Sequence, residues 1–534
     1  MKKIHTLAII SIAFSSLISC GGAAKMLSTP IENIDKRPLK MTPITEAQKM
    51  RWSHLDIDKD TIPGMSVDRA YTEILKNKKG KKVIVAIIDS GIDINHEDLK
   101  AVIWTNPKEV ANNKKDDDNN GYIDDVNGWN FLGGAEHEQL EMTRIVKKGD
   151  DGSAQYQAAK AKFDKEIAEN MQQKQQVDFI INVDNTLKKH LKKDNYTLEE
   201  VKAITSTDEG VNQAKQVMTQ ILSSVPSKAD FDKEIDEFKD YVYDNANYNL
   251  NLEFDGRKVV GDNPNDYNDK KYGNNKVSGI DPKHALHGTH VAGIVAQVRN
   301  NKKGGDGVAN NVAIMAIRAV PNGDEYDKDI AYAIRYAVDN GAKVINGSFG
   351  KSFSTNREWV YEAIKYAASK DVLFVHAAGN DGKDIDKEDN FPNDAAKDNV
   401  EFANNTITVG AIAPVYGANI VAPFSNYGKL NVDVFAPGVE IYATIPNNQY
   451  KYLEGTSMAG PNVSGVAALL RSYYPRLTAA QVKQILIDSV TPITTPVLVG
   501  ESKAKMNFKD FSVSGGIVNA YKAMLLAEKM TVKP

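Results

Sequence analysis

Short apolar runs alternate with amphipathic stretches over two parts of the chain. The first run, residues 83–88, consists of Val, Ile and Ala with no polar interruption. Continuous β-branched runs of this kind are typical of strands buried on both faces of a parallel sheet. Comparable runs recur at residues 312–317, 343–346, 372–375 and 406–409. The pattern therefore predicts at least five buried strands.

Helical patterns lie between and after these runs. The sequence predicts helices over 327–340, 358–369 and 457–474. A further helix is expected after Thr478, which stands three residues before Gln481 in the spacing of a capping box. Strands that alternate with helices predict an α/β fold with three layers, α/β/α, around a mostly parallel central sheet.

One long block interrupts this alternation. Residues 135–275 are rich in Lys, Glu, Asp, Asn and Gln, and their apolar residues recur at helical spacing. These apolar residues are Tyr156, Ala159, Phe163, Ile167 and Met171, followed later by Phe231, Ile235, Phe238 and Val242. We interpret the block as a helical insertion with solvated outer faces. A structural role is the simpler interpretation, and a role in gripping substrate or in inhibition is the alternative.

Four polar residues stand where a buried run ends or an apolar helix begins. Asp89 follows the first run directly, and Asn380 closes the segment after the run at 372–375. His287 and Ser457 each stand beside glycines just before an apolar helical stretch. Sites in open α/β sheets form beyond the carboxyl ends of the strands, so these positions favour a functional site.

Each of these residues also has an ordinary structural interpretation. Asp89 is able to cap the next turn, Ser457 to act as a helix N-cap, and Asn380 to serve as a turn residue. His287 and His290, three positions apart, suggest a metal pair. A zinc-peptidase helix, however, requires His-Glu-x-x-His, and the glutamate general base is absent here.

Together the four motifs resemble the subtilases, the subtilisin-like serine peptidases. They match in residue type, in flanking glycines and in the chain order Asp, His, Ser. The resemblance covers residues 50–135 and 275–490 and implies a subtilisin-like fold and serine endopeptidase activity through an acyl-enzyme. It implies a catalytic triad of Asp89, His287 and Ser457, with Asn380 as an oxyanion donor.

The same resemblance extends to substrate binding. Ser348, Phe349 and Gly350 on one segment, and Ala378 and Gly379 on another, look like the residues that line the primary specificity pocket and pair with the substrate backbone. An extended polypeptide is therefore expected to bind by strand addition. The near-neutral formal charge of −4 gives no basic footprint for nucleic acid.

An acidic loop at residues 116–125 resembles a calcium loop. Oxygen-bearing side chains alternate along it, and glycine stands at the sixth position. The expected ligands are Asp116, Asp118, Asn120 and Asp124. The twelfth position is Asn rather than a bidentate Glu, and a solvated acidic turn is the alternative. Structural calcium is expected here, no cofactor is expected for catalysis, and the stretch 262–269 is interpreted as a loop.

The N-terminus has the pattern of an export signal. Two lysines precede an apolar run over residues 4–18, which is too short to span a membrane. Residues 17–20 resemble a bacterial lipobox, which implies lipidation of Cys20 by acyl chains such as palmitate. Gly21 in place of Asp fits an anchor in the outer membrane, on its periplasmic or surface face. A plain signal peptide with an incidental cysteine is the alternative.

These expectations give a domain organisation. It consists of a lipoprotein signal peptide at 1–19, a tether at 20–50, the first part of the peptidase domain at 51–134, the helical insertion at 135–275 and the second part of the peptidase domain at 276–534. The segment between Cys20 and Trp52 looks too short for an inhibitory pro-domain. Gly460 and Asn462 also depart from the family pattern, but neither removes a catalytic group. The competing hypothesis is a lipid-anchored binding or chaperone-like protein that keeps the fold and hardly cleaves.

Overall fold

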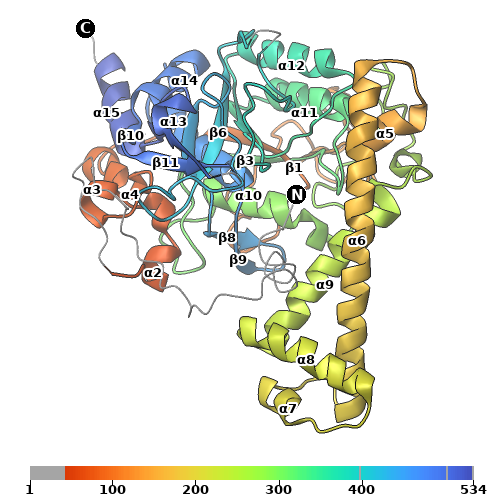
Figure 1. Ribbon diagram of the computed structural model, residues 1–534. Helices are drawn as coiled ribbons and strands as arrows, with labels where there is room; N and C mark the ends of the chain where they lie inside the picture. Colours follow the sequence, from red (N-terminus) through yellow and green to blue (C-terminus); the bar gives the residue numbers. More distant parts are fainter. Residues whose placement is uncertain (1–41, 396–398, 501–502, 532–534) are drawn as a thin grey trace. The chain divides into compact units, whose positions relative to one another are not determined.

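A nine-stranded sheet forms the centre of the larger part of the protein (Figure 1). The computed structural model describes residues 42–395, 399–500 and 503–531. The expected signal peptide, Cys20 and the tether up to residue 41 lie outside the described residues. The chain divides into a helical unit, Met142–Asp255, and a sheet unit formed by the residues before and after it. Within the described ranges, every helix is either too short or too polar to span a bilayer.

The sheet is parallel except at one edge. Its strands, in spatial order, are β10 (Thr491–Pro492), β13 (Gly516–Ile517), β7 (Val434–Pro437), β6 (Thr406–Ile412), β5 (Leu373–Ala377), β4 (Val344–Gly347), β1 (Val83–Asp89), β3 (Val312–Arg318) and β2 (Gly128–Asn130). Only β10 and β13 pair in antiparallel fashion. The mostly parallel sheet confirms the predicted fold class.

Both faces of the sheet are covered by helices. Alternate residues of β1 enter different cores: Val85 and Ile87 join one, and Ala86 and Ile88 join the other. The first core includes apolar residues of α10 (Leu286–Ala296), α13 (Thr456–Tyr473), α14 (Ala479–Asp488) and α15 (Ala520–Thr531). The second includes those of α11 (Asp327–Asp339) and α12 (Arg357–Ser369). The result is the predicted three-layer arrangement.

The long strands lie where the apolar runs predict them, with ends that differ by up to three residues. Strands β2, β7, β10 and β13 of the sheet are not predicted, because two to four residues are too few to show a clear period. The predicted capping box is present: Thr478 Oγ1 accepts from the Gln481 N–H, and the Gln481 side chain accepts from the Thr478 N–H.

Part of the expected tether is folded. Helix α2 (Glu46–Lys49) falls within the range 20–50 and begins with its own capping box. Trp52 follows it, is 1% exposed, and donates its indole N–H to the carbonyls of Val439 and Glu440. Helices α3 (Ile57–Asp60) and α4 (Val67–Ala70) continue this segment, whose apolar side chains belong to the first core.

The helical unit has its own core. It contains α5 from Met142 onward (the helix spans Glu141–Lys148), α6 (Ala154–Leu191), α7 (Leu198–Ala203), α8 (Glu209–Ser224) and α9 (Lys228–Asp244). Its buried residues include Leu187, Met218 and Phe231. The unit is shorter than the expected insertion of residues 135–275, because residues 135–141 and 256–275 belong to the sheet unit.

Candidate active site

Asp89 and His287 meet at the carboxyl end of the central strand. Asp89 is the last residue of β1 and is 1% exposed. Its Oδ1 atom lies 2.6 Å from His287 Nδ1 and also accepts the Ser90 N–H at 2.7 Å. A carboxylate on Nδ1 holds the imidazole in the tautomer whose Nε2 is free to accept a proton. No described residue forms a hydrogen bond with His287 Nε2.

The glycine after His287 allows this close approach. A Cβ atom on Gly288 would lie 2.2 Å from the Gly91 carbonyl oxygen and 3.0 Å from Asp89 Cβ. The first turn of α10 therefore packs directly on the loop after β1. Any larger residue would push the histidine away from the carboxylate.

His290 does not share the environment of His287. Its Nε2 atom bonds to the carbonyl oxygen of Lys451 at 2.9 Å, and burial lowers its pKa to about 3. His287 turns its Nδ1 to Asp89 instead. The two histidines thus engage different partners, and the only cluster of three or more metal-ligating side chains among the described residues lies elsewhere.

Ser457 lies in the first turn of α13. It follows Gly455, whose φ of +145° favours glycine, and its side chain is almost fully buried. Pro461 has no N–H to donate to the Ser457 carbonyl four residues earlier. The Ser348 hydroxyl donates to that carbonyl instead, at 2.9 Å. In return, the Ser457 hydroxyl donates to the Ser348 carbonyl oxygen at 3.3 Å.

Asn380 is held beside Ser457 by hydrogen bonds with Thr456. Its Oδ1 accepts from the Thr456 N–H at 2.8 Å and from Thr456 Oγ1 at 2.9 Å. Because the amide is planar, these two hydrogen bonds also fix the direction of its Nδ2 group. The position that a Cβ would take on Gly455 lies 3.5 Å from Asn380 Nδ2 and 3.6 Å from the Ser457 backbone nitrogen. The two N–H donors therefore border one space.

The expected substrate residues continue from two adjacent strands. Ser348, Phe349 and Gly350 follow β4, and Ala378 and Gly379 follow β5, its parallel neighbour. The Phe349 carbonyl oxygen bonds to Nε2 of the buried His376 at 2.8 Å, and the Gly379 N–H donates to Thr456 Oγ1 at 3.1 Å. The two segments thus end at the same edge of the sheet as Asp89.

The acidic loop does not gather the four expected ligands. Asp124 accepts from the N–H groups of Asn113 and Lys114, at 3.0 and 2.8 Å. Asp116 accepts from the N–H groups of Asn120 and Gly121, at 3.0 and 2.8 Å. These carboxylates therefore stabilise the loop backbone. Of the expected set, the acidic cluster in the structure contains only Asp118.

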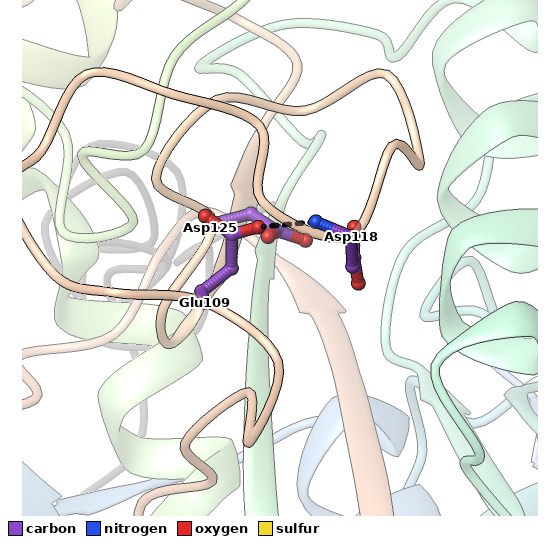
Figure 2. Close-up of side chains that lie close together, drawn as sticks. All are labelled: Glu109, Asp118 and Asp125. Atoms are coloured by element: carbon purple, nitrogen blue, oxygen red, sulfur yellow. Dashed lines mark hydrogen bonds between the residues drawn. The ribbon is translucent and has the colours of Figure 1, made fainter.

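That cluster consists of Glu109, Asp118 and Asp125 (Figure 2). One oxygen from each lies within 4.8 Å of the others, and Glu109 Oε2 is buried with no described hydrogen-bond partner. Burial raises the pKa of Asp125 to about 6. Hard oxygen donors with an unsatisfied carboxylate fit a cation such as calcium. Sequence reasoning missed Glu109 and Asp125, although Asp125 directly follows the expected ligand Asp124.

Comparison with known proteins identifies a family and several relatives. A model described as the subtilase family matches residues 80–511. The chain is 46% identical over 187 residues to the thermophilic serine proteinase of Bacillus sp. strain AK1, which covers 35% of this chain and 42% of that protein. It is 41% identical over 187 residues to thermitase of Thermoactinomyces vulgaris, covering 35% and 61%. It is 36% identical over 206 residues to subtilisin DY of Bacillus licheniformis, covering 38% and 70%.

The chain spans only part of the length of these relatives. The matched stretches span 42% of the Bacillus sp. proteinase, 61% of thermitase and 70% of subtilisin DY. The family model spans well over half of the present chain and contains all four motif residues. The chain belongs to the subtilase family.

Proposed function

We propose that this protein is a serine endopeptidase that cleaves polypeptides through an acyl-enzyme. The observation that carries the proposal is the 2.6 Å contact between Asp89 Oδ1 and His287 Nδ1. It leaves a buried imidazole nitrogen with no described partner, on a helix that packs against the helix bearing Ser457. A general base placed in this way is what a serine needs to become a nucleophile.

Each residue has one role in the proposed reaction. Ser457 Oγ attacks the substrate carbonyl while His287 Nε2 takes its proton and later gives it to the leaving amine. Asp89 keeps the imidazole oriented and stabilises its positive charge. Asn380 Nδ2 and the Ser457 N–H donate to the oxyanion, for which their shared border near Gly455 is suited.

The first step requires the serine hydroxyl to change its partner. Its hydroxyl lies 3.3 Å from the Ser348 carbonyl, a long contact that is easily exchanged. In the proposed reaction it turns to His287 Nε2, and this movement releases the Ser348 carbonyl. The freed oxygen is then available to a substrate N–H, and the peptide lies extended along Ser348–Gly350. The side chain of the residue before the cleaved bond points toward Ala378 and Gly379.

Hydrolysis of an unstructured protein such as reduced casein tests the proposal. The wild-type protein should release peptides, and Ser457→Ala should lose that activity while keeping its melting temperature. Equal release by both proteins would contradict the proposal. Absence of cleavage by a folded wild type would favour the binding or chaperone-like alternative.

We further propose that calcium binds the cluster of Glu109, Asp118 and Asp125. The unsatisfied Glu109 oxygen and the three convergent carboxylates support this site over the set expected from the loop pattern. Bound calcium would neutralise carboxylates that otherwise repel one another. Its role would be to stabilise the loop between β1 and β2, away from the chemistry.

We also propose that the protein is exported across the inner membrane and lipid-anchored through Cys20, in the outer membrane on its periplasmic or surface face. The lipobox-like residues 17–20 and Gly21 support this. Labelling of growing cells with a palmitate analogue tests it, with Cys20→Ser as the control. Incorporation should be lost in the variant, and incorporation that persists would contradict the proposed anchor.

A further inference from the structure

A buried lysine follows directly on the proposed substrate segment. Lys351 comes after Gly350, and its side chain is 2% exposed. Its backbone pairs with Phe391 in both directions, each N–H donating at 2.9 Å. Its ammonium lies 2.9 Å from Asp327 Oδ1 and 3.4 Å from Glu141 Oε2. The lysine is therefore fixed at both its backbone and its charged end.

Further donors hold the carboxylates around this ammonium. Asp327, the first residue of α11, accepts from Ser354 Oγ at 2.9 Å and from the Asn356 N–H at 2.7 Å. Glu141 accepts from Thr355 Oγ1 at 2.7 Å. Buried charges persist only where pairing and hydrogen bonds offset their desolvation. Lys351, Glu141 and Asp327 thus form a buried group of paired charges to which the exposed Thr355 donates, and we define these four residues as the clamp.

Gly350, which directly precedes Lys351 of the clamp, has backbone groups available to a substrate strand. The Ser348 carbonyl faces the Ser457 hydroxyl, and the Phe349 carbonyl is bonded to His376. The Gly350 N–H and C=O, by contrast, form no hydrogen bond with any part of the chain that the structure describes. Strand addition requires such backbone groups to be aligned before the peptide arrives. Glycine cannot hold its own conformation, so its neighbours must do so.

We propose that Lys351 and Glu141 are positioning residues that align Gly350 for the part of a peptide substrate remote from the scissile bond. This inference rests on the proposed endopeptidase function. Neither residue touches the reacting atoms, so their loss should weaken binding of long substrates and leave the chemical step unchanged. Glu141 also directly precedes Met142, where the helical unit begins, so the insertion is covalently continuous with the clamp.

Two substrates with the same cleaved bond separate this role from general stability. One carries a single residue before the bond, and the other carries four. In Glu141→Gln the KM for the long substrate should rise about tenfold, with kcat unchanged. A tenfold change corresponds to the loss of one or two hydrogen bonds. The KM for the short substrate, and the rate of labelling by a fluorophosphonate, should match the wild type.

Two further variants complete the test. Thr355→Val removes only the hydroxyl that donates to Glu141, and it should shift the ratio of the two KM values in the same direction. Glu362→Gln, in the exposed pair with Lys365, is the matched control and should leave that ratio unchanged. If Glu141→Asp keeps the wild-type ratio of the two KM values, the carboxylate charge at this position is what aligns Gly350.

The outcomes separate this inference from the function on which it rests. If the wild type is labelled by the fluorophosphonate and the clamp variants keep its ratio of KM values, the positioning role is wrong and the proposed function stands. Equal losses on the short and long substrates would also overturn it. If the wild type is not labelled, the proposed function itself fails.

Discussion

His287 Nδ1 lies 2.6 Å from Asp89 Oδ1 although 198 positions separate the two residues along the chain. The helical unit Met142–Asp255 lies within that interval. The cost of closing a loop grows only slowly with its length, so an insertion is tolerated where its ends leave the surrounding contacts intact. The contact between the two residues is therefore set by the sheet unit alone.

Asn380→Ala should lower kcat and leave KM nearly unchanged. The lost Nδ2 donor acts on the oxyanion rather than on the ground-state substrate, so the expected cost in kcat is about 10²–10³-fold, typical for one such donor. Steady-state kinetics on a peptide ester measure it. Thr456→Val removes one of the two donors to Asn380 Oδ1 and the acceptor of the Gly379 N–H but keeps Asn380 Nδ2, so it should lower kcat much less. A rise in KM at constant kcat would contradict the oxyanion role.

Gly288→Ala should damage both stability and activity. The new Cβ would meet the Gly91 carbonyl at 2.2 Å, and overpacking of this kind costs about 1–3 kcal/mol. Thermal melts and kcat measure the two effects. Gly460→Ala is the matched control, because its Cβ would lie 3.5 Å from the nearest atom, Ser348 Oγ. If the two variants behave alike, the close approach of α10 to the loop after β1 is not needed.

The stability of the sheet unit should fall as pH rises from about 4 to 7. Burial raises the pKa of Asp394 to about 7 from an ordinary value of 3.8, against the opposing charge of Lys483 and with the help of Asp433 and Glu401. Between these two values the native state holds a proton that the unfolded chain has released, so deprotonation favours unfolding. Below pH 4 this contribution is fully present, and above pH 7 it is lost.

Asp394→Asn tests this dependence because an amide does not titrate. Its melting temperature should vary less than that of the wild type between pH 4 and pH 7, and the two curves should run parallel above pH 8. The exposed Asp58→Asn should keep the wild-type slope. An unchanged slope in Asp394→Asn would show that other groups dominate in this window.

Calcium should raise the melting temperature, and Asp118→Asn should remove most of that rise. At a calcium concentration 100 times its Kd, a single bound ion stabilises the native state by about 2.7 kcal/mol. Asp116→Asn is the control, since its carboxylate binds loop N–H groups rather than the cluster. A calcium response lost in Asp116→Asn as well as in Asp118→Asn would favour the ligand set expected from the sequence, which contains both residues.

The motif residues could be found from the sequence because each is marked locally. A buried run ending in Asp89, and glycines beside His287 and Ser457, are visible without knowing what lies across the fold. The same holds for the sheet, whose long strands are continuous apolar runs. Such features depend on neighbours within a few positions, and for that reason the fold class could be predicted. The Asp89–His287 contact joins distant positions, and it is expected only from the resemblance of the motifs to the subtilases.

Features that depend on side-chain direction could not be predicted. Asp124 has a φ of +54°, a left-handed turn that no spacing rule reveals, and it turns its carboxylate toward the Asn113 and Lys114 N–H groups. Glu141 and Lys351 are 210 positions apart, and neither lies in a recognisable motif. Charged residues in sequence are assumed to be solvated, and only the packed structure shows these two to be buried together.

The most direct measurement of the central claim is the site at which a fluorophosphonate attaches to the intact protein. Mass spectrometry of the labelled and digested chain should place a single adduct on Ser457, with labelling abolished in Ser457→Ala and greatly slowed in His287→Ala. An adduct on another residue, or equal labelling of Ser457→Ala, would contradict the account.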